Sequence, residues 1–357
     1  MTGIVAVGEN DTKLWGLTAG ERLERIVRAR GLEEAPVIAH LGYVWDPAWL
    51  VHVAGRPGAI VTLGGVPVLA HVEGEAERER IIAAMRENRP ITEGLAWEES
   101  GGLLNDELRK RERPFMDRLA QDTVRSLERA SYFGAYKGVT DILTKYLWPE
   151  WALVLTRLAA RIGMTPNQVT LIGAILCVAA TFAFYHGHYW SGLAMGLVFM
   201  VLDTVDGKLA RCTITSSWWG NVFDHGIDLV HPPFWWWAWG MGLIPYGLPL
   251  EPAVFWGVMA VIVGGYVVQR LIEGAFIGLF GMHIHVWRPF DSRFRLVTAR
   301  RNPNMVILLA FLIAGRPDWG LIAVAAWTLL SLLVHLVRLL QAMAEKARGR
   351  EVTSWLG

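Results

Sequence analysis

Residues 203–211 read Asp-Thr-Val-Asp-Gly-Lys-Leu-Ala-Arg, and residues 220–228 read Gly-Asn-Val-Phe-Asp-His-Gly-Ile-Asp. Both stretches lie beside or inside sequence that is apolar enough to form membrane helices, yet together they hold four aspartates. Ionised aspartates close to hydrocarbon are costly, so they rarely serve packing and usually mark a functional site. This part of the chain therefore predicts membrane helices that carry such a site.

Helical spacing brings the aspartates of each stretch onto one face. Asp203 and Asp206 are about one turn apart. Gly220, Asp224 and Asp228 recur every four residues, which is also about one turn. Four carboxylates that meet between two packed helices repel one another unless cations neutralise them. Ligands that are all oxygen select Mg²⁺, Mn²⁺ or Ca²⁺ over zinc, and two such ions suit a pyrophosphate substrate.

Small residues and one arginine accompany the aspartates. Gly207, Ala210 and Gly220 lack bulk at positions where a ligand would approach the backbone. The guanidinium of Arg211 can form paired, charge-assisted hydrogen bonds with phosphate oxygens. The pattern thus predicts a ligand that contains phosphate.

At every fixed position, the two stretches match the signature D-x2-D-G-x2-A-R-x8-G-x3-D-x3-D. The chain therefore resembles the CDP-alcohol phosphotransferases, which are integral membrane enzymes. The resemblance extends upstream to residues 165–170, Thr-Pro-Asn-Gln-Val-Thr, which are similar to the P-N-x-x-T entry of the first membrane helix in that family. It covers roughly residues 139–345.

The resemblance implies a role for each residue of the motif. Asp203, Asp206 and Asp224 would be ligands of two divalent metal ions, Mg²⁺ or Mn²⁺, and Asp228 would be both a ligand and the general base. The nucleotide site would comprise the small and polar residues of the motif and of its upstream element, namely Gly207, Ala210, Arg211, Gly220, Asn167 and Thr170.

The implied reaction transfers a substituted phosphate group from a CDP-alcohol, of the CDP-diacylglycerol or CDP-inositol type, to an acceptor hydroxyl. It releases CMP and forms a phosphodiester in phospholipid or polyol-phosphodiester synthesis. Members of the family are often dimers, so a homodimer is expected. Two other classes stay open, namely an intramembrane cation or proton transporter and a catalytically inactive membrane scaffold. The glycines and the Ala-Arg pair favour the enzyme, because a proton relay requires none of them.

The overall composition indicates a mixed architecture. The chain has 357 residues, of which 53% are hydrophobic and 19% are charged. It is too apolar for an ordinary soluble protein and too charged to lie in a membrane throughout. The formal net charge of +1 argues against a nucleic-acid partner, whose binding would need a basic surplus.

We predict a mainly α integral membrane protein with six transmembrane helices, a juxtamembrane amphipathic helix and a small α/β cytosolic N-terminal domain. The amphipathic helix is expected over 139–162, at the bilayer surface. The apolar stretches that follow it lie at about 168–187, 189–211, 216–241, 252–280, 304–316 and 319–343. Positive residues on alternate connections place both termini and the aspartate motif on the cytoplasmic side. We expect the membrane to be a prokaryotic inner or plasma membrane.

Changes in composition divide the chain into four parts. We expect an α/β domain over 1–104, an exposed linker helix over 105–138, the membrane domain over 139–346 and a cytosolic tail over 347–357. In the first part, strands are predicted at 3–8, 36–40, 49–53 and 59–72, and helices at 20–30 and 75–88. Residues 7–18 faintly resemble the phosphate loop of sugar-phosphate nucleotidyltransferases. Glu9 and Asp11 replace its glycines, which implies a degenerate, noncatalytic domain with a docking or structural role.

The acceptor remains open at the level of sequence. Arg270 and Glu273, with a group of downstream arginines, could bind a phosphorylated polyol such as inositol phosphate or glycerol phosphate. The alternative is that these arginines set the topology and contact anionic membrane lipids. The downstream group is Arg288, Arg293, Arg295, Arg300 and Arg301. His283 and His285 are interpreted as loop residues rather than as a metal site.

Overall fold

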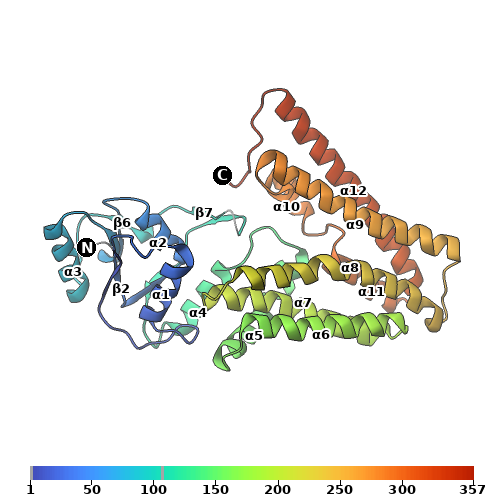
Figure 1. The fold of residues 1–357 in the computed structure, drawn as a ribbon, viewed down its shortest axis with the longest axis horizontal. Helices are drawn as coiled ribbons and strands as arrows, with labels where there is room; N and C mark the ends of the chain where they lie inside the picture. The colour runs from blue at the N-terminus through green and yellow to red at the C-terminus, as the bar shows by residue number, and fades with distance from the viewer. Residues whose placement is uncertain (1–2, 106–107) are drawn as a thin grey trace. The chain divides into compact units, whose positions relative to one another are not determined.

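The computed structural model describes residues 3–105 and 108–357, and Figure 1 shows its helices and strands. The chain forms two compact units. The first comprises Met1–Tyr136, Thr156–Thr165 and Lys208–Ser216, and the second comprises Lys137–Leu155, Pro166–Gly207 and Ser217–Gly357. The prediction of a mainly helical protein with a small N-terminal sheet is confirmed.

The first unit is built on a five-stranded mixed sheet in the order β1-β2-β5-β4-β6. β1 is parallel to β2, β2 is antiparallel to β5, and β4 is antiparallel to β5 and parallel to β6. The β4–β5 turn consists of Gly64 and Gly65, both with positive φ, which glycine adopts without steric cost. The five strands are β1 (Val5–Val7), β2 (Val37–His40), β4 (Ile60–Leu63), β5 (Val66–His71) and β6 (Leu95–Ala96).

Three helices accompany this sheet, namely α1 (Ala19–Arg30), α2 (Pro47–Ala54) and α3 (Glu75–Glu87), and a 3₁₀ turn, η1 (Trp97–Glu99), follows β6. The strand predicted at 49–53 is wrong, because these residues lie in α2. The carboxylate of Asp46 accepts the backbone N–H of Ala48, and Pro47 opens the helix. An aspartate cap followed by proline begins a helix, and here it outweighs the strand preference of the apolar run.

The linker helix predicted over 105–138 is wrong for its first half. β7 (Leu103–Asn105) pairs with β8 (Lys110–Glu112), and β9 (Met116–Arg118) pairs with β3 (Tyr43–Trp45). Residues 106–107 lie outside the described residues. α4 begins only at Val124 and ends at Gly134. Pro114 cannot donate a helical hydrogen bond, and Met116 is buried within the first unit, where it pairs with Trp45, so strand pairing replaces the helix.

In the second unit, each of the six predicted apolar stretches forms a helix. Among the described residues, α6, α9 and α12 are long and apolar enough to cross a membrane. α11 has only 13 residues, so the count of six spans stays a prediction. The six helices are α6 (Pro166–Tyr185), α7 (Tyr189–Cys212), α8 (Trp218–Tyr246), α9 (Pro252–Phe280), α11 (Arg301–Ile313) and α12 (Pro317–Ala347).

Shorter elements flank these helices. A π-helical turn, η2 (Leu143–Leu147), precedes α5 (Pro149–Arg161), and between α9 and α11 lie the 3₁₀ turn η3 (Ile284–Val286) and α10 (Pro289–Phe294). Along α5, Trp151, Val154 and Leu158 are exposed at helical spacing. An exposed apolar stripe is typical of a helix at a bilayer surface, although this location stays a prediction.

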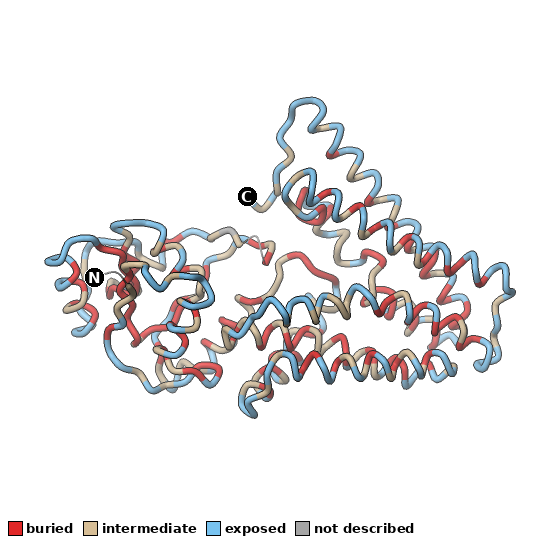
Figure 2. Tube along the Cα trace, in the orientation of Figure 1, coloured by how far each residue is buried: buried red, intermediate tan, exposed pale blue. Residues whose placement is uncertain are grey.

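The second unit has a packed interior and an apolar exterior. Trp235 and Trp239 of α8 are fully buried, and their ring N–H groups donate to the carbonyl oxygens of Cys177 and Pro317, respectively. Many outward residues of these helices are exposed, as the pale blue stretches of Figure 2 show. They include large hydrophobic side chains such as Ile175 and Phe182 of α6. Extensive exposed apolar surface on apolar helices indicates an integral membrane protein.

Candidate functional site

Three of the four motif aspartates converge in the second unit. Asp203 lies on α7, and Asp224 and Asp228 lie one turn apart on α8. Each offers a carboxylate oxygen, and these atoms lie within 4.8 Å of one another. Carboxylate oxygens are the ligands that Mg²⁺ and Mn²⁺ prefer in proteins. We call Asp203, Asp224 and Asp228 the carboxylate cluster.

Asp206, the fourth aspartate, is buried one turn after Asp203 on α7. The hydroxyl of Thr170 on α6 donates to Asp206 Oδ2 at 2.6 Å, and the backbone N–H of Gly207 donates to Oδ1 at 2.5 Å. Hydrogen bonds to an ionised group are among the stronger ones in proteins. Thr170 therefore lies at the site, where it fixes the orientation of a motif carboxylate.

Asn167 and Gly220 are also brought together. A Cβ atom at Gly220 would lie 2.9 Å from Asn167 Oδ1 and 3.0 Å from Ser217 Oγ. Real Cβ atoms do not approach neighbours so closely, so a larger residue at this position would require the side chains of Asn167 and Ser217 to move. The backbone N–H of Gly220 donates to Ser217 Oγ, which caps α8.

The last turns of α7 carry Gly207, Ala210 and Arg211. Residues Lys208–Ser216 group with the first unit. The Lys208 ammonium donates to the carbonyl oxygen of Ala135 at 2.8 Å and lies 3.2 Å from the ring centre of Tyr136. The nucleotide roles of Ala210 and Arg211 therefore stay predictions that rest on the motif.

Arg301, the first residue of α11, is the site residue whose role was missed. Its Nη1 contacts Asp228 Oδ1 at 2.5 Å, and its Nη2 contacts Asp203 Oδ2 at 2.7 Å. Only 11% of its side chain is exposed. On sequence alone, Arg301 is one of several arginines that could set topology or bind an acceptor. The available signal was its place at the start of an apolar helix, where a charge needs a partner.

A chain of hydrogen bonds continues from Arg301 to Asp141. Arg301 Nε donates to Asn302 Oδ1 at 3.0 Å, and the Asn302 amide donates to Asp141 Oδ1 at 3.0 Å. Asp141 also accepts the backbone N–H and the hydroxyl of Thr144. Burial raises the pKa of Asp141, but the charge of Arg295 and the bonds from Thr144 and Asn302 outweigh it and hold the pKa below its ordinary value. Asp141 is therefore an ionised anchor for the residues behind the carboxylate cluster.

Two arginines considered for a phosphorylated acceptor have a partner within the protein. Arg270 Nη2 lies 2.9 Å from Glu273 Oε1, and Arg300 contacts the same oxygen. A guanidinium that is paired with a carboxylate attracts a phosphate less strongly than an unpaired one does. For Arg270 and Arg300, the structure favours ion pairing within the protein over acceptor binding.

Residues 163–276, which include both motif stretches and Asn167, match the family model described as CDP-alcohol phosphatidyltransferase. Residues 163–276 thus form a CDP-alcohol phosphatidyltransferase domain. This finding confirms the family resemblance, and the converging aspartates lie within the matched residues.

Curated relatives agree with the family model. The chain is 32% identical to cholinephosphotransferase 1 of Gallus gallus over 32% of this chain and 36% of the relative. It is 36% identical to phosphatidylinositol phosphate synthase of Streptomyces avermitilis over 25% of this chain and 38% of that relative. It is 32% identical to archaetidylinositol phosphate synthase of Pyrococcus horikoshii over 31% of this chain and 54% of that relative. The chain thus spans about a third to a half of the length of these relatives.

Proposed function

We propose that this protein transfers a substituted phosphate group from a CDP-alcohol to an acceptor hydroxyl, releasing CMP and forming a phosphodiester. The observation that carries the proposal is the convergence of Asp203, Asp224 and Asp228 inside a CDP-alcohol phosphatidyltransferase domain. A proton relay would not require the small residues that the motif places beside these carboxylates.

Asp203, Asp206, Asp224 and Asp228 would hold two divalent metal ions, Mg²⁺ or Mn²⁺. The donor set fits such ions because it offers only carboxylate oxygens, three of them within 4.8 Å of one another. The positive charge of Arg301 on Asp203 and Asp228 indicates that this cluster needs cations. When bound, the ions would neutralise the diphosphate of the donor and stabilise CMP as the leaving group.

Asp228 is the proposed general base. With 42% of its side chain exposed, it is the motif aspartate that an acceptor hydroxyl can most easily reach. It would take the hydroxyl proton while the acceptor oxygen bonds to phosphorus and the bond to CMP breaks. Arg301 would hold the Asp228 carboxylate in position through its bond to Oδ1. The account requires no covalent nucleophile.

The nucleotide would bind along Gly207, Ala210, Arg211 and Gly220, with Asn167 and Thr170 at the same end of α6. The motif supports Gly207, Ala210, Arg211 and Gly220. The close approach of Asn167 to Gly220 supports Asn167. In this arrangement the guanidinium of Arg211 would pair with phosphate oxygens of the donor.

The substrates we propose are a CDP-diacylglycerol or CDP-inositol type donor and a lipid alcohol or phosphorylated polyol as acceptor. The names of two relatives, both synthases of inositol phosphate lipids, support a phosphorylated polyol as acceptor. We further propose six membrane spans, a cytoplasmic active site and cytoplasmic termini in a prokaryotic inner membrane. We also propose a homodimer and, for residues 1–104, a noncatalytic docking or structural role.

The test is a substrate panel with purified protein in lipid nanodiscs. CDP-diacylglycerol and CDP-inositol are each offered with inositol phosphate, glycerol phosphate, serine and lipid alcohols, and the products and CMP are identified by mass spectrometry. We expect CMP release that depends on Mg²⁺ or Mn²⁺ and disappears in the folded variants Asp203→Asn and Asp228→Asn. Cation flux into sealed vesicles without CMP formation would show a transporter. A lack of metal-dependent CDP binding would show a scaffold.

A further inference from the structure

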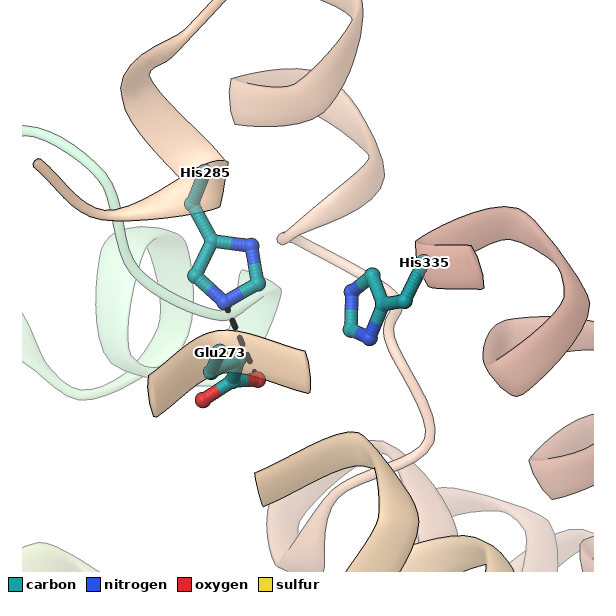
Figure 3. A group of neighbouring side chains, drawn as sticks. All are labelled: Glu273, His285 and His335. Carbon is teal, nitrogen blue, oxygen red and sulfur yellow. Dashed lines mark ion pairs between the residues drawn. The ribbon is translucent and has the colours of Figure 1, made fainter. Parts of the chain in front are cut away.

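A second group of potential ligands lies outside the motif. Glu273 on α9, His285 in η3 and His335 on α12 each offer one ligand atom, and these atoms lie within 4.8 Å of one another. Figure 3 shows the three side chains around a common space. Only 3% of His285 and 2% of His335 is exposed. We call Glu273, His285 and His335 the histidine cluster.

His335 has polar atoms that nothing satisfies. Neither ring nitrogen has a hydrogen-bond partner within the described ranges 3–105 and 108–357. In Figure 3 the ring is directed toward Glu273 and His285. A buried polar group without a partner costs about 1–3 kcal/mol, so native structures rarely contain one without a reason. A ligand in the common space would bond to a nitrogen of His335.

The other two members are prepared for a cation. His285 Nε2 lies 3.3 Å from Glu273 Oε1, so the imidazole and the carboxylate already face each other. Arg270 and Arg300 stabilise the negative charge of the Glu273 carboxylate and fix its position. The same two guanidinium groups repel a metal ion, so binding is expected to be weaker than at a site without them.

We propose that Glu273, His285 and His335 form a zinc site that joins η3 to α9 and α12. Two imidazoles and one carboxylate, with water in the fourth position, are a ligand set that zinc accepts. In a tetrahedral zinc site the ligand atoms are roughly 3.4 Å apart, given bond lengths of about 2.1 Å. The present separations of up to 4.8 Å therefore require only small side-chain movements.

The test measures zinc content in protein purified without a histidine tag. The chain is stripped with a chelator, dialysed against zinc and analysed by mass spectrometry of the metal. His335→Phe keeps a ring against Phe294 but has no ligand atom. His231→Phe is the matched control, because His231 is a buried histidine of α8 outside the cluster. We expect about one zinc per chain in the wild type and in the control, and a loss of at least fivefold in His335→Phe.

Two further readouts keep the proposal testable if His335→Phe does not fold. Co²⁺ added to the stripped wild type should give the visible absorption of a tetrahedral site with nitrogen ligands, and zinc should raise the unfolding temperature by several degrees. Wild-type protein that shows neither effect would overturn the proposal, as would unchanged zinc content in a folded His335→Phe protein. Stabilisation by inorganic phosphate in place of zinc would also overturn it and would identify an anion site.

Discussion

The carboxylate cluster and the histidine cluster both gather potential metal ligands, but they differ in chemistry and in exposure. The first offers only oxygen atoms, and Asp228 remains partly open to solvent. The second offers two imidazoles and one carboxylate, and both of its histidines are buried. Oxygen ligands with access suit hard ions that meet a substrate, whereas buried nitrogen ligands suit an ion that holds segments together.

Two consecutive arginines at the start of α11, Arg300 and Arg301, each contact one of the two clusters. Arg300 contacts Glu273 and His285, whereas Arg301 contacts Asp203 and Asp228. Neighbouring residues at a helix start point in different directions, so each guanidinium reaches a different cluster. Substitutions at 300 and at 301 can therefore separate the two roles.

The largest effect is expected from removal of the proposed base. Asp228→Asn should lower the rate of CMP release about 10²–10⁴-fold, which is the usual contribution of general base catalysis. His335→Phe should stay within about twofold of the wild type, because the histidine cluster lies outside the proposed chemistry. Steady-state assays with saturating Mg²⁺ measure the rate of CMP release in both variants. Equal losses in the two variants would show that the clusters do not have separate roles.

Arg301→Gln should lower stability when metal is removed. Loss of one partner from a buried ion pair costs about 3–5 kcal/mol, and we expect about 2–3 kcal/mol because Asp228 is 42% exposed. Mg²⁺ should restore most of this loss by neutralising the carboxylates. The measurement is the unfolding temperature in chelator and in Mg²⁺.

Arg300→Gln is the matched control for that comparison. Its partner is Glu273, so Mg²⁺ should change its unfolding temperature no more than it changes that of the wild type. An equal response to Mg²⁺ in both variants would contradict the assignment of Arg301 to the carboxylate cluster.

A smaller effect is expected from Thr170→Val, which removes the hydrogen bond to Asp206 and keeps the side-chain shape. Hydrogen bonds to charged groups contribute about 1.5–3 kcal/mol, so the Mg²⁺ concentration for half-maximal activity should rise about tenfold. Thr181→Val on the same helix is the control, because the Thr181 hydroxyl donates only to the backbone oxygen of Cys177. A similar shift in both variants would rule out a specific role for Thr170.

The smallest effect concerns Asp141, which supports Arg301 through Asn302. Because the pKa of Asp141 is held below its ordinary value of 3.8, its stabilising effect is complete above about that pH and is lost as the pH falls further. Asp141→Asn should be less stable than the wild type by about 1–2 kcal/mol at neutral pH. Thermal unfolding from pH 7 to pH 3 should show this difference shrinking below about pH 3.8. A difference that grows in acid would contradict the account.

Much of the fold could be predicted from the sequence, because long apolar runs allow few conformations in a membrane protein. The six helices of the second unit lie within a few residues of the predicted stretches. Short elements were harder to predict. The apolar run 49–53 fits a strand, but the cap at Asp46 makes it a helix, and the charged segment after residue 105 forms strands because Met116 finds a buried place beside Trp45.

In the candidate site, too, local features could be predicted from the sequence, whereas contacts between distant residues could not. The spacing of the motif predicts that Asp203 and Asp206 share one helix face and that Asp224 and Asp228 share another, which is a local property of the chain. The contacts of Arg301 with Asp203 and Asp228 span 98 and 73 residues. Such contacts depend on how α11 packs, which no local pattern encodes. His335 lies in an apolar helix and joins His285 only through the tertiary fold, so the sequence suggested no cluster there.

Binding of Mn²⁺ at the carboxylate cluster is the central claim, and anomalous diffraction from crystals grown with Mn²⁺ and CDP tests it most directly. We predict Mn²⁺ peaks among Asp203, Asp206, Asp224 and Asp228, next to the diphosphate, and no Mn²⁺ peak there in Asp203→Asn crystals. Wild-type crystals that bind CDP but show no Mn²⁺ among these aspartates would contradict the account.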